Sequence, residues 1–260
     1  MKAPRVWLVP ALAAVLFIVV YGLDANRAVF VVLNRIGPAT SDGLWANLTL
    51  IGDATVGFAL CLPLWRRRPD LLWAVAFVAL LGTAWVHGLK SGFDVPRPPA
   101  VLGDAVHVIG PAYKTHSFPS GHATTAFAIG GLLFLGLRSA AGRTLVLAVA
   151  TVAAISRPVI GVHWPLDVLA GAFGGWLSAV LALYLAGKTE KVGKHWAVQW
   201  LLALLLGACA VALALGHPDD YPRAVLLERA IGLACLAAAA VELWRDARLG
   251  HAGLGRHPGL

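Results

Sequence analysis

The sequence predicts an all-α protein, built as a polytopic bundle of transmembrane helices. Apolar residues make up 59% of the 260 residues and charged residues 13%, against about 25% charged residues in typical soluble domains. The apolar residues form continuous runs rather than alternating with polar ones, which favours helices over a closed barrel as the spanning structure. Most basic residues lie in short clusters between these runs, as membrane topology signals do.

Eight apolar runs follow one another along the chain. A helix needs about 20 residues to cross the hydrocarbon core of a bilayer, and six of the eight runs come close to that length. We expect a core of six helices followed by a C-terminal helix pair. The runs cover residues 6–23, 54–65, 71–89, 121–137, 144–160, 165–186, 196–215 and 224–244.

Two segments near the N-terminus are less regular. The run at 54–65 is too short to span a membrane unless its helix begins earlier, near Leu44. Residues 24–43 are apolar but interrupted, with Val29 and Leu33 at helical spacing. We expect this second segment to lie along the outer surface of the membrane.

The basic residues divide unevenly between the two sides of the predicted bundle. By the positive-inside rule the richer side is cytoplasmic. Both termini are then cytoplasmic, and the loops 90–118 and 157–164 face the periplasm or the exterior, across a bacterial inner (plasma) membrane. The richer side holds thirteen of the 21 Lys and Arg residues, namely Lys2, Arg5, Arg66, Arg67, Arg68, Arg138, Arg143, Lys188, Lys191, Lys194, Arg245, Arg248 and Arg256.

The charged stretch 188–194 is the candidate boundary along the chain. It separates a six-helix unit at 1–187 from a linker and helix pair at 188–260. The formal net charge of +8 does not indicate a nucleic-acid partner, because the cations lie in the clusters that set topology. Cys61, Cys209 and Cys235 lie within apolar runs, so we expect no structural disulfide. The sequence leaves the oligomeric state open.

Three polar clusters lie at the predicted outer ends of helices. Together they bring three cations, two imidazoles and a carboxylate to one membrane face, and ionisable groups at such a boundary indicate a functional site. The clusters are Lys90 to Pro98 with Arg97; Pro119, Ser120, Gly121 and His122; and Ser156 and Arg157 with His163 and Asp167.

The residue types in these clusters suit an anionic ligand. Ser120 is a good N-cap for a helix beginning at Gly121, and a helix N-terminus offers unpaired N–H groups to an anion. Asp167 can hydrogen-bond one ring nitrogen of His163 and leave the other as a nucleophile or base. Three cations, Lys90, Arg97 and Arg157, outnumber this carboxylate and therefore indicate an anionic ligand. Phosphate fits, because arginine binds it through paired donors.

Each residue also has an ordinary structural interpretation. His122 could be a cap or interface residue, Lys90 and Arg97 could extend to lipid headgroups, and Asp167 could balance the dipole of its helix. The three clusters in order, each at an outer helix end, favour a functional site. Four other histidines on the predicted outer side are interpreted as bystanders, namely His87, His107, His116 and His217. Of these, His116 is the one close enough to Ser120 to support it.

The three clusters together form a known pattern. The chain resembles the type 2 phosphatidic acid phosphatase superfamily, whose pattern is K-x6-RP, then PSGH, then SR-x5-H-x3-D. Every motif position matches. The motifs span residues 90–167 and the six-helix arrangement covers 1–187, so the final helix pair lies outside the resemblance.

The resemblance implies a role for each matched residue. His163 attacks phosphorus and forms a phosphohistidine, Asp167 orients it, and His122 protonates the leaving oxygen and then activates water. No metal ion or cofactor is expected, since the cations supply the charge. The phosphate oxygens are held by Lys90, Arg97, Ser120, the Gly121 amide and Arg157.

The predicted function is hydrolysis of a lipid phosphate or pyrophosphate at the outer membrane face. A site at headgroup depth suits a substrate whose tail stays in the bilayer, and undecaprenyl pyrophosphate is the favoured substrate. Phosphatidylglycerol phosphate, phosphatidic acid and the lipid A phosphates are alternatives. A phosphotransferase between lipids would share every motif, whereas an anion transporter would more naturally place its charges near the membrane midplane.

Overall fold

The computed structural model describes residues 4–216 and 221–254, and every regular element in these ranges is helical. The predicted all-α fold is therefore confirmed for the described part. Lys2, His217 and Arg256 lie outside the described residues. The main helices are α1 (Pro4–Gly22), α2 (Asn26–Asn34), α3 (Ile36–Ala39), α4 (Asp42–Leu50), α5 (Ala54–Ala59), α6 (Pro69–Gly92), α7 (Pro98–Leu102), α8 (Gly121–Gly136), α9 (Ala140–Val159), α10 (Pro165–Lys188), α11 (Glu190–Gly193), α12 (Trp196–Leu215) and α13 (Val225–Leu254), with short 3₁₀ turns η1 (Leu62–Leu64), η2 (Gly103–Ala105) and η3 (Pro222–Ala224).

The helices confirm a multi-span membrane protein. Within the described residues, α6, α9, α10, α12 and the segment 222–246 are each long and apolar enough to cross a membrane, and two bent helix pairs bring the number of candidate spans to seven. Helix α8 is shorter, with 16 residues. At 1.5 Å per residue it is about 24 Å long, less than the roughly 30 Å of a hydrocarbon core.

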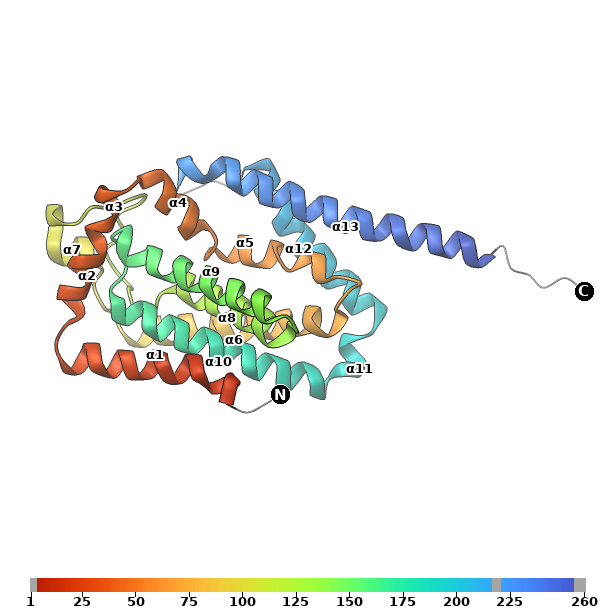
Figure 1. Ribbon diagram of the computed structural model, residues 1–260, viewed down its shortest axis with the longest axis horizontal. Helices are drawn as coiled ribbons and strands as arrows, with labels where there is room; N and C mark the ends of the chain where they lie inside the picture. Colours follow the sequence, from red (N-terminus) through yellow and green to blue (C-terminus); the bar gives the residue numbers. More distant parts are fainter. Residues whose placement is uncertain (1–3, 217–220, 255–260) are drawn as a thin grey trace, which may run out of the picture.

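Both irregular N-terminal segments are bent helix pairs. Helices α2 and α3 turn by 107° from α1 and run across one end of the bundle (Figure 1). The second span begins at Asp42, earlier than the apolar run at 54–65, and bends by 54° between α4 and α5. Asp53 caps α5 by accepting hydrogen bonds from the Thr55 and Val56 amides at 2.7 and 3.2 Å, so a new helix starts there.

Helix α10 lies at the centre of the bundle and packs on α1, α6 and α8. Two glycines let its backbone approach α8 closely. A Cβ at Gly171 would lie 2.7 Å from the Ser120 carbonyl oxygen, and one at Gly175 would lie 2.3 Å from that of Thr124. Any larger residue would force the two helices apart. This contact sets the start of α10 against the start of α8, where the polar clusters lie.

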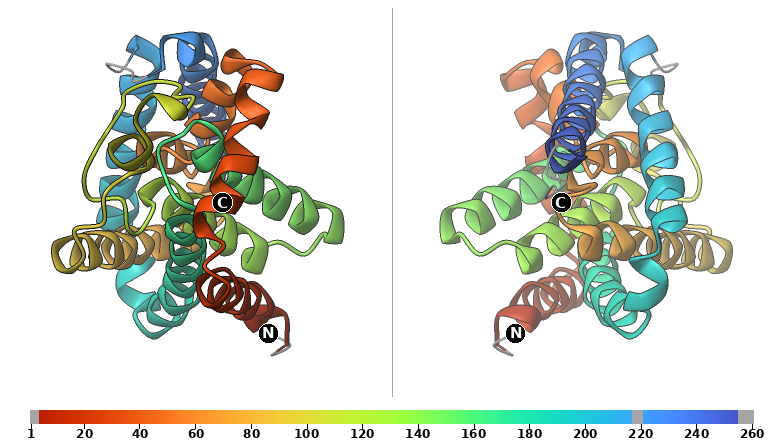
Figure 2. Two further views of the ribbon diagram at one scale, coloured as in Figure 1. Left: turned by 90° about the vertical axis from the view of Figure 1, so that its left-hand side faces the viewer. Right: turned by 90° about the vertical axis from the view of Figure 1, so that its right-hand side faces the viewer.

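The C-terminal helices α12 and α13 pack on the opposite flank from α1. Figure 2 shows them beside the α4–α5 span and away from α1, and Leu206, Ala210 and Leu213 of α12 share one buried core with Ala59 and Leu72. The far end of α13 extends beyond the rest of the bundle, at the end opposite α7 (Figure 1). The helix pair is therefore packed into the bundle and forms one core with it.

Candidate active site

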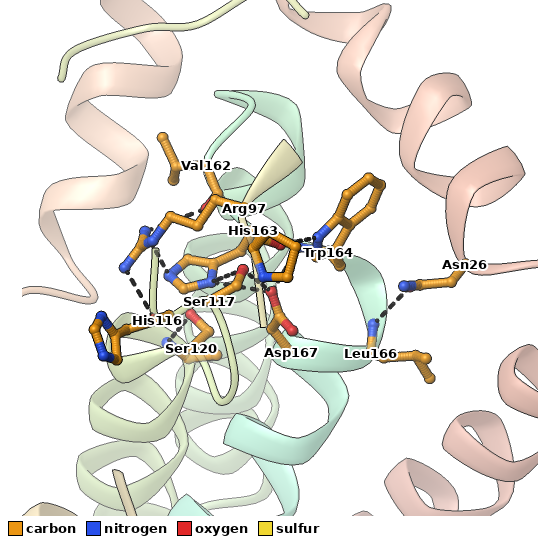
Figure 3. Close-up of polar contacts among 12 residues, drawn as sticks. Asn26, Arg97, His116, Ser117, Ser120, Val162, His163, Trp164, Leu166 and Asp167 are labelled. Carbon is orange, nitrogen blue, oxygen red and sulfur yellow. Dashed lines mark hydrogen bonds and ion pairs between the residues drawn. The ribbon is translucent and has the colours of Figure 1, made fainter. Parts of the chain in front are cut away.

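Helix ends and loops from all three sequence clusters meet at the end of the bundle that carries α7. Lys90 lies in the last turn of α6, Arg157 in the last turn of α9, and Ser120 just before α8. The loop after α6 carries Arg97, and the turn between α9 and α10 carries His163. Figure 3 shows these loops converging on the first turn of α10.

His163 and Asp167 form a buried pair. The His163 Nδ1 atom lies 3.2 Å from Asp167 Oδ2, and the two side chains are each 2% exposed. The same Oδ2 accepts a hydrogen bond from the Trp164 amide at 2.8 Å and another from the Ser117 hydroxyl. Pro165 at the first position of α10 and Asp167 at the third are both favoured at a helix start. The local fold of this helix end therefore fixes the carboxylate.

Arg97 lies on the other side of the imidazole. Its Nη1 is 3.2 Å from His163 Nε2 and 3.2 Å from the Val162 carbonyl oxygen, and its Nε donates to the Thr115 carbonyl oxygen at 2.9 Å. A guanidinium has donors only, so Nε2 of His163 must accept with its lone pair. The imidazole proton then sits on Nδ1 and is donated to Asp167. A neutral His163 with its Nε2 lone pair directed at a cation is the chemical centre of the site.

Burial and nearby charge keep this imidazole neutral. Burial is the larger cause, and the charges of Arg97, Arg157 and Lys90 add to it, so the pKa of His163 lies well below its ordinary value. His122 of the second cluster also acts on His163, so residues of all three clusters lie within electrostatic range of this imidazole. With three cations against one carboxylate, the site has an excess of positive charge that suits an anion.

Arg157 is held deep in the site by neutral partners. Its side chain is 3% exposed, and Nη1 donates to Thr49 Oγ1 at 2.7 Å and to the Tyr221 hydroxyl oxygen at 3.2 Å. Its buried Nε has no hydrogen-bond partner among the described residues. A buried donor without a partner costs about 1–3 kcal/mol, so this position is suited to an oxygen of a bound ligand.

Ser120 and Gly121 join the two central helices. The Ser120 hydroxyl accepts from the Ala123 amide at 3.3 Å and so caps α8, as the sequence predicts. The Ser120 amide donates to the Asp167 carbonyl oxygen at 3.0 Å. The Ser120 carbonyl oxygen accepts a hydrogen bond from the Thr124 hydroxyl. The N-terminus of α8 therefore begins beside the His163–Asp167 pair.

His122 faces a different environment, in the first turn of α8. It lines a cavity of about 240 Å³ whose walls also include Asp53, His87 and the apolar residues Phe58 and Ile129. Two of the histidines interpreted as bystanders lie elsewhere: His107 Nε2 is 2.9 Å from Asp42 Oδ1, and the His116 side chain is 57% exposed. The His116 carbonyl oxygen nevertheless lies 3.5 Å from Arg97 Nη2.

Sequence reasoning missed three residues of the site. Ser117 lies just outside the second motif, and only its closeness to Ser120 could have indicated it. Thr49 and Tyr221 are 108 and 64 residues away from Arg157 along the chain, so no local pattern connects them. Among the side chains that the structure describes, His, Cys, Asp and Glu form no group of three or more that could hold a metal ion.

Comparison with known proteins finds similarity both in sequence and in structure. Residues 71–191 match the model of the PAP2 superfamily. The chain is 48% identical over 77 residues to the bacitracin transport permease protein BcrC of Bacillus licheniformis, covering 30% of this chain and 37% of BcrC. It is 33% identical over 132 residues to the putative undecaprenyl-diphosphatase YbjG of Escherichia coli, covering 48% of this chain and 62% of YbjG.

A solved structure shares the fold. The crystal structure of Aquifex aeolicus LpxE superposes with a TM-score of 0.56 at 29% sequence identity, covering 61% of this chain and 94% of LpxE. The chain thus matches less than two thirds of the length of BcrC and YbjG, but almost all of LpxE. Residues 71–191 of this chain are therefore similar to the PAP2 superfamily, and this family match ends before α12.

Proposed function

We propose that this protein is an integral-membrane phosphatase that hydrolyses a lipid phosphate or pyrophosphate through a phosphohistidine. The observation that carries the proposal is the buried His163, whose Nε2 lone pair is directed at Arg97 while Nδ1 contacts Asp167. A phosphate group binding between the two side chains would take the donors of Arg97 and free Nε2 for attack. Phosphoryl transfer is mainly positioning and charge stabilisation, and the other cations, Lys90 and Arg157, add to both.

The reaction has two steps. His163 Nε2 forms a bond to phosphorus while the bond from phosphorus to the leaving oxygen breaks. His122 enters this step protonated, because the bound phosphate anion offsets the surrounding cations, and gives the leaving oxygen its proton. A water molecule then attacks the phosphohistidine as His122 takes up one of its protons, which releases inorganic phosphate and restores neutral His163. Asp167 supports the positive charge on the imidazole in the intermediate. The cavity beside His122 offers room for the leaving group and water.

The phosphate oxygens would be held by residues from each cluster. Lys90, Arg97 and Arg157 provide the positive charge, and no step needs a metal ion. The start of α8, with Ser120 and the Gly121 amide, adds N–H donors and the positive end of a helix dipole.

The favoured substrate is undecaprenyl pyrophosphate, at the outer face of a bacterial plasma membrane. Support comes from the site's position at the ends of spanning helices, where a headgroup can enter while the tail stays in lipid, and from the similarity to YbjG, a putative undecaprenyl-diphosphatase. The orientation follows the distribution of basic residues, which puts both termini in the cytoplasm. In intact cells, a membrane-impermeant thiol reagent should label a cysteine at Ala105 but not one at Thr189; the reverse would contradict this orientation.

Purified full-length protein incubated with a panel of lipid phosphates tests the activity. The panel contains undecaprenyl pyrophosphate, phosphatidic acid, phosphatidylglycerol phosphate and lipid A, with free phosphate as the readout. We expect release that survives EDTA and is blocked by vanadate. Phosphate found on a second lipid would identify a phosphotransferase instead. Because BcrC is named a transport permease, proteoliposomes provide a further arm: anion uptake without hydrolysis would contradict the proposal.

A further inference from the structure

The C-terminal helix pair contributes directly to the site, although it lies outside the family match at 71–191. Tyr221 stands between α12 and α13, is 6% exposed, and accepts a hydrogen bond from Nη1 of Arg157. Thr49, on the first half of the bent second span, accepts from the same nitrogen. Two segments far apart in sequence therefore meet on one nitrogen of a cation in the site.

Further contacts hold Tyr221 in place. Just after it, Arg223 forms an ion pair with Asp42 at 3.2 Å, and its carbonyl oxygen accepts from the Asn47 amide group at 3.4 Å. Both partners belong to α4, the helix that carries Thr49 (Figure 1). These contacts hold the segment that carries Tyr221 against α4, whose Thr49 also accepts a hydrogen bond from Arg157.

The chemistry of the two partners matters. Both are neutral hydroxyls, so they fix the direction of the guanidinium without compensating its charge. A carboxylate in either place would attract Arg157 more strongly and would offset the charge that a phosphate needs. Because Nη1 is occupied, the unpartnered Nε is a donor that remains for a ligand oxygen.

We propose that Tyr221 and Thr49 are positioning residues that aim Arg157 at the substrate phosphate, and that the C-terminal helix pair is thereby part of the active site. This inference rests on the proposed function for the identity of the ligand. It assigns to α12 and α13 a role in phosphate affinity in addition to their packing. Neither hydroxyl needs to contact the substrate for this role.

The test replaces each hydroxyl by an isosteric group in the full chain, with Tyr221→Phe and Thr49→Val. Each hydroxyl accepts one hydrogen bond from a charged group, so we expect its loss to raise KM and the vanadate inhibition constant about tenfold or more. Changes in kcat and Tm should be small. Tyr21→Phe, at an exposed tyrosine of α1, and Thr151→Val, whose hydroxyl bonds only within α9, are matched controls.

A double-mutant cycle separates positioning from a general structural effect. In an Arg157→Lys background the guanidinium is absent, and Tyr221→Phe should then change KM little. Full additivity of the two substitutions would overturn the inference, as would an unchanged KM and vanadate affinity in Tyr221→Phe alone. A variant that loses only Tm, with unchanged vanadate affinity per folded molecule, would also overturn it.

Direct binding of vanadate, measured by calorimetry, keeps this inference distinct from the proposed function. If the wild-type protein hydrolyses no lipid phosphate but binds vanadate, and Tyr221→Phe weakens that binding, the positioning role stands and the proposed function fails. If the wild type hydrolyses lipid phosphates and Tyr221→Phe behaves like Tyr21→Phe, only the positioning role fails.

Discussion

The two histidines of the site lie in contrasting surroundings. His163 is 2% exposed and is held from both sides, by Asp167 at Nδ1 and by Arg97 at Nε2. His122 instead lines a cavity that it shares with Asp53 and His87. A nucleophile gains from a fixed, dry position, because its attack needs one geometry. A group that exchanges protons with a leaving group and with water needs access to both.

The strongest test of this contrast removes His163, the proposed nucleophile. His163→Ala should lower kcat by about four to six powers of ten, because no other group can carry the covalent step. Phosphate release from a lipid substrate measures the loss, with His195→Ala, an exposed histidine at the start of α12, as the control. Gel filtration should show that the variant stays folded. Turnover near that of the wild type would exclude the phosphohistidine mechanism.

Removing the other histidine should give a smaller, substrate-dependent effect. His122→Ala should lower hydrolysis of a lipid phosphate by about 10² to 10⁴, the usual contribution of general acid–base catalysis. With p-nitrophenyl phosphate, whose leaving group needs no proton, the first step should survive and the second should stall. Rapid mixing should then show a burst of one equivalent of nitrophenol. Equal losses with both substrates and no burst would argue against the assigned role.

Substitutions of Asp167 and Ser117, which hold His163 in place, should lower activity by different amounts. Asp167→Asn should lower kcat by about a hundredfold, because the amide can no longer stabilise the charged imidazole or fix its tautomer. Ser117→Ala removes one of the hydrogen bonds to Asp167 and should cost about tenfold. Ser178→Ala, which removes a hydroxyl bonded to Gly174 within α10, is the matched control. A loss for Ser117→Ala as small as that of the control would mean that this hydroxyl has no part in catalysis.

The smallest effect is a displacement of the pH profile. Since the pKa of His163 is lowered by burial and by neighbouring cations, Nε2 keeps its lone pair below the ordinary histidine value of about 6.5. As pH falls, kcat/KM should therefore persist through 6.5 and decline only in more acidic solution. Removing one cation with Lys90→Met should raise the pKa of His163 and move this acid limb to higher pH. An acid limb at or above 6.5 in the wild type would contradict the lowered pKa.

Local features of the sequence were enough to predict the helices and the candidate residues of the site. Each of the eight apolar runs contains an α-helix, because continuous apolar residues in lipid have no other way to satisfy their backbone. The run at 54–65 is α-helical only to Ala59 and continues into a 3₁₀ turn. Ser120 and Pro165 mark the starts of α8 and α10 through cap and first-turn preferences that operate within a few residues. The spacing of His163 and Asp167 likewise brings them together across a single helix start.

The first half of the second span, α4, could not be predicted from local sequence features. Hydropathy detected only the half of this span that follows Asp53, since α4 contains polar residues such as Asp42 and Asn47. In the structure these residues have partners in distant segments, Arg223 for both and His107 for Asp42. Their polarity is balanced by tertiary contacts, so hydropathy alone could not include them in a span.

By itself, the sequence determined the helical bundle, the motif residues and the sign of charge around the site, because each depends on neighbouring residues or composition. Only the tertiary structure decided that Ser117 supports Asp167 and that Thr49 and Tyr221 hold Arg157. These contacts join residues 50 to 108 positions apart, and they form because glycine-mediated packing of α10 on α8 and docking of the C-terminal helices bring those chain segments to one place. No pattern within a short window carries that information, since the closeness of two distant segments is a property of how the whole bundle packs.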